Sequence, residues 1–580
     1  MTLAFDRSSA GGLSLDRGSL THWTAQGRTR LERADFWRLA DRYLDLITDE
    51  SRIGSMGIVV SRTSLDMMAL FVALIAAGRV AAFFPPRSPR QDAEAYLEQQ
   101  RAAALRIAGC SILALEGEDA GLDWMDASLA SRVERLPRLS LEASTEPAAE
   151  GRALEGFARA LARDELIFCQ HSSGTTGIKK AVDISARALL RQFGSYWPTV
   201  QASFGETPIR VASWLPLYHD MGLVAGFLLP LLGGSELALI DPFEWVESPQ
   251  LFLELIEAEG STVCWMPNFA FRHFTRLQSF MPARKLDAMR LWISCSEPCR
   301  YADALAFERA YRSMGVRSGS VVGCYAMAET VFAASQLEAG GQRALLVPRP
   351  LQPGEDVMAA GARETTDRDP PLRAGEQALL CSGEPVPEIE ARIFVGGQPA
   401  AAGVYGEIGL KGDFVFGGYR ELSAEQSNIR RDGFYMTGDL GVILDRRLYV
   451  VGRTKEMVIV NGKNLYLGDV EDKVGSAPGV RPGRAVAFGL DNPALGTEDL
   501  VIVAERDPGA PLSDAEIRTG VTAAVMDAFL VKPHDVQIVS DRWLVKTTSG
   551  KVSRSGNKAK FLRDFRSDAD ARAFSRGPAP

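Results

Sequence analysis

The sequence lacks the cysteine spacings of a zinc-bound or disulfide-bonded protein. Its seven cysteines are scattered over 580 residues, and no two of them stand in a Cys-x-x-Cys spacing. Cys295 and Cys299 come closest, and neither a histidine nor a second cysteine pair nearby completes a zinc site. We therefore expect reduced thiols, most of them buried as small apolar side chains, and a cytoplasmic location.

A basic excess, a secretory signal and a long apolar run are also missing. The net charge of −8 argues against a general nucleic-acid binder. Residues 1–7 lack the basic start and apolar run of a signal peptide. The longest apolar stretch, residues 67–77, is shorter than the roughly 20 residues that cross a bilayer. We expect no membrane span and interpret this stretch as a buried helix that leads into a short strand at residues 80–84.

The sequence does contain a rhythm of helical and strand-like segments, in a chain too long for one hydrophobic core. Helical periodicity occurs at residues 31–47, 64–77 and 249–259. Short apolar runs of the strand type occur at 56–61, 210–214, 261–266 and 289–294. Such alternation predicts parallel sheets covered by helices. We therefore predict an α/β fold with a large N-terminal domain over residues 1–452.

Later segments predict further units. Residues 340–377 are rich in Pro, Gly, Arg, Glu and Thr, with weak periodicity, which indicates a loop-rich excursion. Short strand patterns at 388–395, 406–411, 441–444 and 448–451 predict a β-rich subdomain over residues 379–451. Helical patterns at 469–475 and 514–528, between strand patterns at 457–460, 484–489, 499–505 and 535–539, predict a small, mobile α+β C-terminal domain over residues 453–580.

The segment from Phe168 to Lys180 carries the strongest chemical signal. It reads FCQHSSGTTGIKK, an apolar strand followed by a loop of Gly, Ser and Thr that ends in lysine. Such a loop presents several backbone N–H groups and hydroxyls to one anion, and Lys180 adds a mobile positive charge. The spacing is not that of a Walker A loop. The segment therefore predicts a polyphosphate-binding loop.

This loop resembles the phosphate-binding loop of adenylate-forming enzymes, the superfamily of acyl-CoA synthetases, nonribosomal adenylation domains and luciferases. Four further motifs are similar to that superfamily and follow its order: YAMAET at 325–330, YMTGD at 435–439, the hinge GRTKE at 452–456 and the lysine-bearing loop KTTSGK at 546–551. The resemblance covers nearly the whole chain, from about residue 31 to residue 562.

Within that superfamily the chain is most similar to the fatty acyl-AMP ligases. SWLPLYHDMGL at 213–223 resembles their Trp-Leu-Pro-x-Tyr-His-Asp-Met-Gly-Leu, and MPNFAF at 266–271 resembles their Pro-Asn-Phe-Ala-Tyr. Residues 340–377 stand where these ligases carry an insertion that acyl-CoA synthetases lack. The chain departs from the usual pattern at Lys179, Ala181, Ala326 and Val545, and SCSEP at 294–298 replaces Asn-Gly-Ala-Glu-Pro. None of these departures removes a charged group that the chemistry requires.

The resemblance implies a role for each matching residue in the nucleotide site. The outer phosphates of ATP are held by Ser172, Ser173, Gly174, Thr175, Thr176, Gly177 and Lys180. The adenine is bordered by Ser296, Glu297, Pro298, Tyr325, Ala326 and Met327. Mg²⁺ is bound by Glu329, with Thr175 or Thr176 nearby. The ribose hydroxyls are taken by Asp439, and Arg453 supports the same side.

The resemblance also implies roles at the reacting groups. Lys551 completes the adenylation site together with Lys180 and Glu329, and Lys455 is the hinge between the domains. Met266 and Pro267 are expected in the acyl pocket. For His219 a place in that pocket and a hydrogen bond in the core both stay open.

The implied reaction is the ATP- and Mg²⁺-dependent activation of a fatty or other carboxylic acid to an acyl adenylate, with release of pyrophosphate. Transfer of the acyl group to the phosphopantetheine thiol of an acyl carrier protein is expected to follow. Basic residues between 551 and 576 suit an acidic carrier protein, although a solvated helix and a frayed tail explain them equally well.

Three alternatives stay open. An acyl-CoA synthetase is disfavoured by the excursion at 340–377. An amino-acid adenylation domain needs an acidic partner for the substrate ammonium, for which Asp220 is a conceivable candidate. A non-catalytic ATP-binding protein is disfavoured by the retention of Lys180, Glu329, Asp439 and Lys551.

Overall fold

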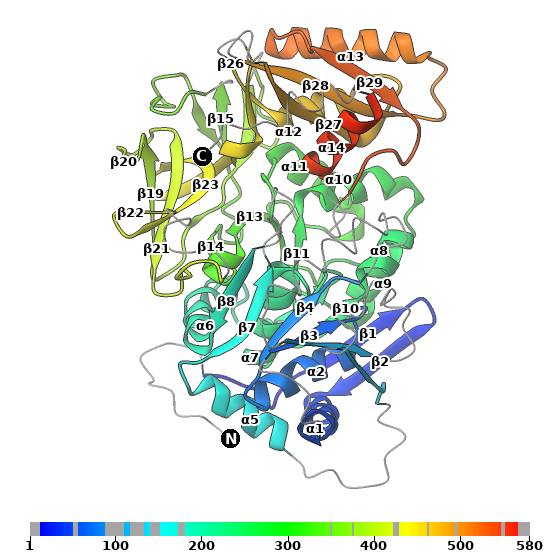
Figure 1. Cartoon of the computed structure of the whole chain (residues 1–580), viewed down its shortest axis with the longest axis vertical. Helices are drawn as coiled ribbons and strands as arrows, with labels where there is room; N and C mark the ends of the chain where they lie inside the picture. The colour runs from blue at the N-terminus through cyan, green and yellow to red at the C-terminus, as the bar shows by residue number, and fades with distance from the viewer. Residues whose placement is uncertain are drawn as a thin grey trace.

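The chain folds into an α/β structure of large helix-covered sheets, a β-rich unit and a small C-terminal part (Figure 1). The computed structural model describes residues 12–49, 56–86, 110–115, 133–139, 151–171, 180–348, 351–373, 376–420, 429–460, 463–492, 497–546 and 552–565. In Figure 1 the β-rich unit lies to the left of the large N-terminal part, and the C-terminal part, in orange and red, lies above it.

The first large sheet has six strands in the order β6-β5-β3-β4-β7-β8, parallel except for the β7–β8 pair. Its strands are β3 (Met56–Val60), β4 (Val80–Phe84), β5 (Cys110–Leu115), β6 (Val133–Leu136), β7 (Leu166–His171) and β8 (Ala181–Ser185). The accompanying helices are α1 (Arg33–Asp49), α2 (Leu65–Ala76), α5 (Arg152–Leu161) and α6 (Ala186–Gln201). Every side chain of α2 from Met67 to Ile75 is buried, which confirms the prediction of a core helix at residues 67–77.

The second large sheet has nine strands in the order β18-β14-β13-β12-β11-β9-β10-β1-β2. They are β1 (Ser19–Thr24), β2 (Gly27–Glu32), β9 (Arg210–Ser213), β10 (Glu236–Ile240), β11 (Val263–Pro267), β12 (Leu291–Cys295), β13 (Val321–Ala326), β14 (Ala333–Gln336) and β18 (Glu384–Pro385). Five consecutive pairs from β13 to β1 are parallel, as the sequence rhythm predicts. The helices connecting these strands are α7 (Leu229–Leu232), α8 (Pro242–Glu247), α9 (Gln250–Glu259), α10 (Asn268–Leu277) and α11 (Tyr301–Ala310).

One predicted helix begins later than the sequence indicates. The helix predicted at 31–47 includes residues 31 and 32. In the structure these two residues form the end of β2, which pairs with β1 in an antiparallel hairpin. Leu31 is buried in this hairpin, so its apolar side chain mimics the first position of the helical pattern.

The prediction of a loop-rich excursion at residues 340–377 is wrong in part. The structure forms a three-stranded antiparallel sheet there, of β15 (Ala344–Pro348), β16 (Arg363–Thr365) and β17 (Glu376–Leu380). Ala344 to Val347 are all buried, so this strand shows no polar–apolar alternation. This short apolar run follows Gly340-Gly341 and precedes a stretch rich in Pro, Gly and charged residues, so the composition of the segment masked it.

The β-rich unit follows as an antiparallel sheet in the order β20-β19-β21-β23-β22, with β24 paired to β23. Its strands are β19 (Ile389–Val395), β20 (Gln398–Pro399), β21 (Gly406–Gly412), β22 (Arg430–Arg431), β23 (Phe434–Leu444) and β24 (Arg447–Arg453). The predicted strand at 441–444 is only the end of β23, which is 11 residues long.

The C-terminal part contains its own apolar cores, such as the cluster of Val470, Val474, Leu500, Ile502 and Val521. Its elements are β25 (Met457–Val460), β26 (Lys463–Tyr466), α12 (Leu467–Gly475), β27 (Val480–Asn492), β28 (Thr497–Arg506), α13 (Asp514–Phe529), β29 (Asp535–Val539) and α14 (Arg554–Phe565). A separate core supports the boundary predicted after residue 452, which stays a proposal.

No helix in the described ranges is long and apolar enough to cross a membrane.

Candidate active site

Asp439 of β23 lies where three strands meet, and its side chain is buried. Its Oδ1 accepts the Nε–H of Arg453 on β24 at 2.7 Å, and its Oδ2 accepts the hydroxyl of Tyr325 on β13 at 2.6 Å. Ala326, partly buried, and Met327, buried, follow Tyr325. Each carboxylate oxygen has two lone pairs, so both can accept a further donor such as a sugar hydroxyl.

The turn before Asp439 sets the direction of its backbone. Gly438 has a φ of +72°, in the left-handed region that favours glycine. Its N–H donates to Glu407 Oε1 at 3.0 Å, and the Asp439 N–H donates to Thr437 Oγ1 at 3.0 Å. Thr437 donates in turn to the carbonyl of Ile408 at 2.9 Å. The Thr-Gly-Asp motif therefore forms one hydrogen-bonded turn that presents the carboxylate.

Glu329 lies in a short 3₁₀ turn just after β13, and a strained turn follows it. Val331 has a φ of 62° and a ψ of −51°, and the Phe332 N–H donates to the Thr330 carbonyl at 2.6 Å. This is the γ-turn of the rare form, at a β-branched residue that seldom adopts positive φ. The Gln170 side chain donates to the Val331 carbonyl at 3.0 Å and helps to hold the turn. Backbone strain of this kind is concentrated at functional sites.

Two buried tyrosines support the Glu329 carboxylate. The Tyr419 hydroxyl donates to Glu329 Oε1 at 2.5 Å and lies 3.3 Å from the Tyr435 hydroxyl. The Phe416 N–H donates to the Glu329 carbonyl at 2.8 Å. Burial raises the pKa of Glu329, and the Tyr419 hydrogen bond opposes that rise. The site therefore holds a buried carboxylate whose ionised form a nearby cation would stabilise.

Lys180 joins this group from the start of β8. Its Nζ lies 4.5 Å from the centroid of the Tyr419 ring, within the range of a cation–π contact. Burial lowers the pKa of Lys180, the positive charge of Lys455 lowers it further, and Glu329 opposes both effects. Lys455 is exposed in the turn Thr454–Glu456, between β24 and β25. The predicted hinge residue therefore shares one electrostatic environment with Lys180 and Glu329.

The Ser-Glu-Pro motif continues from the end of β12. Ser296 has a φ of 67°, and its Oγ lies 3.7 Å from Met221 Sδ. Glu297 Oε1 accepts the N–H of Phe269 at 2.5 Å, in the first turn of α10, so this carboxylate stabilises a helix N-terminus. Pro298 is exposed beside them.

An apolar pocket lies beside Ser296. It is lined by Trp214, Leu215, Pro216, His219, Met221, Gly222, Pro267, Phe269 and Ser296. Of the three residues predicted for an acyl pocket, His219 and Pro267 line it. Met266 does not, because it is fully buried on β11, where neighbouring side chains point to opposite faces. His219 Nδ1 also contacts the buried Asp220, so a place in the acyl pocket and a role in the core both stay predictions for His219.

Several predicted residues lie outside the described ranges: Ser172, Ser173, Gly174, Thr175, Thr176, Gly177 and Lys551. The base of the Lys551 loop is described, because Lys546 and Val552 pair across it. Burial and the positive charges of Arg276 and Lys546 lower the pKa of His273 on α10. The charge of Lys546, at the base of this loop, therefore acts on His273 of α10.

Glu329 suits a divalent cation such as Mg²⁺. Protein sites usually hold Mg²⁺ through one or two carboxylates together with substrate phosphates. Glu329 is such a carboxylate, 9% exposed and bonded at Oε1 by one hydroxyl. Within the described ranges no group of three His, Cys, Asp or Glu side chains forms a metal cage, so other ligands would have to come from the substrate or from elsewhere in the chain.

Sequence reasoning missed Tyr419, which contacts both Lys180 and Glu329. Its only sequence signal is the aromatic and glycine run FVFGGY at 414–419, which matches none of the motifs used above. The fold supplies the connection, because Tyr419 bridges to Val182 of β8 and the Arg420 N–H donates to the Ala181 carbonyl at 3.1 Å.

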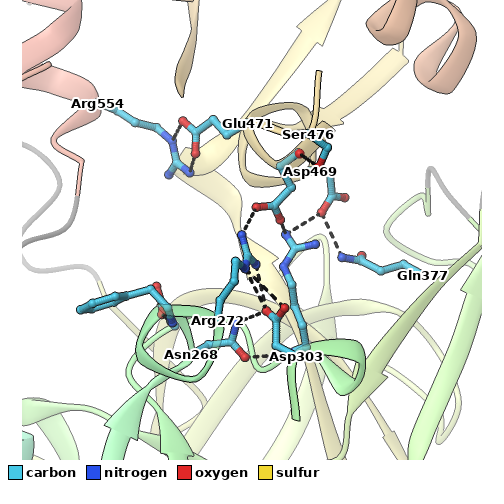
Figure 2. Close-up of polar contacts among 12 residues, drawn as sticks. Asn268, Arg272, Asp303, Gln377, Asp469, Glu471, Ser476 and Arg554 are labelled. Atoms are coloured by element: carbon cyan, nitrogen blue, oxygen red, sulfur yellow. Dashed lines mark hydrogen bonds and ion pairs between the residues drawn. The ribbon is translucent and has the colours of Figure 1, made fainter. Parts of the chain in front are cut away.

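The C-terminal part contacts the N-terminal part through a cluster of arginines and aspartates (Figure 2). Arg272 of α10 donates to Asp472 Oδ1 of α12 at 2.8 Å and to Asp303 Oδ2 of α11 at 2.9 Å. Arg300 makes ion pairs with Asp472 and with Asp469, the latter at 3.4 Å. These contacts hold α12 against α10 and α11.

Comparison with known proteins agrees with these observations. The family model described as AMP-binding enzyme matches residues 23–420. The putative ligase Rv1013 of Mycobacterium tuberculosis is 30% identical over 400 residues, which cover 68% of this chain and 71% of the relative. The long-chain-fatty-acid–AMP ligase FadD26 of Mycobacterium bovis is 27% identical over 426 residues, which cover 68% and 70%.

A solved structure shares the fold over nearly the whole chain. It comes from work on fatty acyl-adenylate ligases of E. coli and L. pneumophila, and it matches with a TM-score of 0.76 at 21% identity, covering 95% of this chain and 96% of that one. At this identity the match establishes the fold, including the large N-terminal and small C-terminal parts.

Proposed function

This chain belongs to the AMP-binding enzyme family and is an adenylate-forming, ATP-dependent acid ligase, and from that premise we propose that it is a fatty acyl-AMP ligase. The observation that carries the proposal is the convergence of Asp439, Tyr325 and Arg453 with Glu329 and Lys180 beside an apolar pocket.

The proposed first reaction joins the acid to AMP. A carboxylate oxygen attacks the α-phosphorus of ATP, and the bond from that phosphorus to the pyrophosphate oxygen breaks. Asp439 accepts the ribose hydroxyls, while Lys180 and residues 172–177 bind the outer phosphates. Lys551 bridges the carboxylate and the α-phosphate. Such catalysis consists mainly of positioning and charge stabilisation.

Glu329 would hold Mg²⁺, which supplies positive charge to the phosphate oxygens when it is bound. Thr175 or Thr176 would lie beside it. The pKa of Glu329, raised by burial, means that acidification protonates this carboxylate sooner than an exposed one. Tyr419 holds the carboxylate in place at Oε1.

In the proposed second reaction a phosphopantetheine thiol of an acyl carrier protein attacks the acyl carbonyl, and AMP leaves. The exposed basic residues of the C-terminal part include Arg542 and Arg563, each of which is paired with a neighbouring aspartate, Asp541 or Asp564. Lys558 and Lys560 do not belong to a free basic surface, because their Nζ atoms donate to the carbonyls of Gly489 and Trp543, both at 2.7 Å. The double variant Arg542→Glu, Arg563→Glu therefore tests docking, since transfer should slow at low salt while acyl-AMP formation continues.

The alternatives differ in acceptor or substrate. Asp220 does not favour an amino acid as substrate, because it is 7% exposed, accepts the Met221 N–H at 2.9 Å and contacts His219. Acyl-CoA synthesis is disfavoured by the sheet β15–β17, whose Gln377 donates to Asp469 of α12 at 3.1 Å and so ties the C-terminal part to this segment. A cytoplasmic location is part of the proposal, supported by seven free, buried cysteines.

One experiment tests the proposal. The purified chain is incubated with ATP, Mg²⁺ and a panel of carboxylic acids, and acyl adenylate is trapped as hydroxamate while CoA and a phosphopantetheinylated carrier protein compete as acceptors. We expect acid-dependent hydroxamate and acyl carrier protein product with little acyl-CoA. Efficient acyl-CoA formation would overturn the assignment to acyl-AMP ligases, and no hydroxamate with any acid would overturn the activity itself.

A further inference from the structure

The apolar pocket beside Ser296 is the place where the acyl part of the acid would lie if the proposed function holds. It touches the Ser-Glu-Pro motif at Ser296, and it also touches Phe269, whose N–H donates to Glu297 of that motif. Its lining is mainly apolar, with His219 and Ser296 as polar members. Its shape therefore limits which acids reach the nucleotide.

One side of this pocket is a wall two indole rings thick. Trp214 lines the pocket, and Trp245 of α8 stacks on it with ring centroids 3.7 Å apart and an interplanar angle of 6°. Phe269, another lining residue, meets both rings edge-on with centroids 6.2 Å away. Trp214 therefore has an aromatic ring on one face and the pocket beside it.

Trp245 is itself fixed from behind. It is 2% exposed and packs edge-on against His273 and Phe274 of α10. Its helix α8 is capped by Asp241, whose Oδ1 accepts the Phe243 N–H at 2.8 Å and whose Oδ2 accepts the Thr63 N–H at 2.9 Å. Because Trp245 is enclosed in this way, it cannot move aside and make room for the Trp214 ring to leave the pocket wall.

We propose that Trp245 is a positioning residue for acid selection, which holds Trp214 as the wall of the acyl pocket and limits the substrate to compact acids, either short-chain or ending in an aromatic ring. Trp214 lies in the Trp-Leu-Pro segment. Trp245, which stacks on the far face of Trp214, lies outside every motif used above, so Trp245 is the residue that distinguishes this pocket. Flat or short acyl groups suit a narrow cavity lined by aromatic rings. The empty space is about 320 Å³ with the open mouth included, so the enclosed part of the pocket is smaller than this.

The wild-type enzyme provides the first test. ATP–pyrophosphate exchange is measured with hexanoate, phenylpropanoate, dodecanoate and palmitate. We expect kcat/KM for hexanoate or phenylpropanoate to exceed that for dodecanoate and palmitate at least tenfold. A preference for dodecanoate or palmitate would overturn the inference while leaving the proposed function intact. Exchange with none of these acids or others would instead count against the proposed function.

Variants of the wall provide the second test. In Trp245→Leu we expect the ratio of kcat/KM for dodecanoate to that for hexanoate to rise at least tenfold, whereas Trp245→Phe, which keeps a ring behind Trp214, should restore the wild-type ratio. Trp197→Leu is the matched control, because Trp197 is equally buried and does not line the pocket. A merely structural role would lower both rates and leave the ratio unchanged. An unchanged ratio in folded Trp245→Leu, or the same change in Trp197→Leu, would overturn the inference.

Discussion

Asp472 gives the sharpest test of how the C-terminal part is held. It accepts two arginines from the N-terminal part, Arg272 at 2.8 Å and Arg300 in an ion pair, and neighbouring Asp469 accepts Arg300 and Gln377 (Figure 2). Replacing Asp472 by alanine removes both arginine contacts of one carboxylate. Arg272 keeps its second partner, Asp303, so the change leaves no buried charge without a counter-ion.

The expected size of the effect follows from the exposure of these groups. The side chains of Arg272, Arg300 and Asp472 are 28%, 24% and 29% exposed, so solvent screens each pair in part. Fully exposed pairs contribute about 0.2–1 kcal/mol, and hydrogen bonds to charged groups about 1.5–3 kcal/mol. We therefore assign about 1 kcal/mol of docking free energy to each pair, and about 2 kcal/mol to the two pairs together. The equilibrium constant between docked and undocked C-terminal part should then fall roughly 30-fold.

A distance measurement reports the docked population directly. All seven cysteines are buried, so spin labels attach selectively at cysteines introduced in place of the exposed Asp369 and Met526. In Asp472→Ala we expect a second population in the distance distribution, together with a changed ratio of the acyl-AMP and acyl-transfer rates. Asp514→Ala is the control, since it breaks an ion pair with Arg506 inside the C-terminal part. An Asp472→Ala distribution and rate ratio equal to those of the control would refute the reasoning.

Three further outcomes are expected. Lys551→Ala should lower acyl-AMP formation on the order of 10²–10³-fold with an unchanged circular dichroism spectrum, and near-normal turnover would contradict its role. Asp439→Asn should raise the apparent KM for ATP, because the amide has one acceptor oxygen where the carboxylate has two. An unchanged KM would argue against ribose binding. Burial raises the pKa of Asp241 to about 6, so the folded state binds this proton more tightly than the unfolded state, and the stability that Asp241 contributes is full below about pH 4 and is lost as the pH rises to about 6. That change amounts to about 3 kcal/mol, and urea titrations of Asp241→Asn, which has no such proton, should lack it. Equal pH slopes for the two proteins would rule it out.

Much of the fold is visible in the sequence because short apolar runs mark buried strands and helical periodicity marks the helices that cover them. Strands β3, β4, β25 and β29 have the predicted bounds or end within a residue of them. Helix α2 begins one residue after its predicted start, since Ser64 caps it by accepting the Met67 N–H at 3.2 Å. The strand β15 escaped prediction because its short apolar run stands in a segment otherwise rich in Pro, Gly and charged residues, which indicate a loop.

The residues of the site fall into two groups, those that a sequence motif reveals and those that only the fold brings together. Motifs reveal residues that act from one continuous loop, such as Thr437 to Asp439, whose side chains and N–H groups bond to one another. They do not reveal partners that only the fold brings together. Tyr419 reaches Glu329 across 90 residues of sequence, and Trp245 stacks on Trp214 through the packing of α8. Nothing in the local sequence of Tyr419 or Trp245 indicates either contact.

The contact of Tyr325 with Asp439 depends on how the β-rich unit is joined to the nine-stranded sheet. Gly383 lies where the two sheets meet. It packs so closely against β14 that a Cβ atom there would lie 1.9 Å from the Gln336 backbone. On its other side, the Leu448 N–H of β24 donates to the Gly383 carbonyl at 2.9 Å. With a φ of +79°, this position suits only glycine. A residue with no functional group thus lets β14 and β24 approach each other, and these strands pair with β13 and β23, which carry Tyr325 and Asp439.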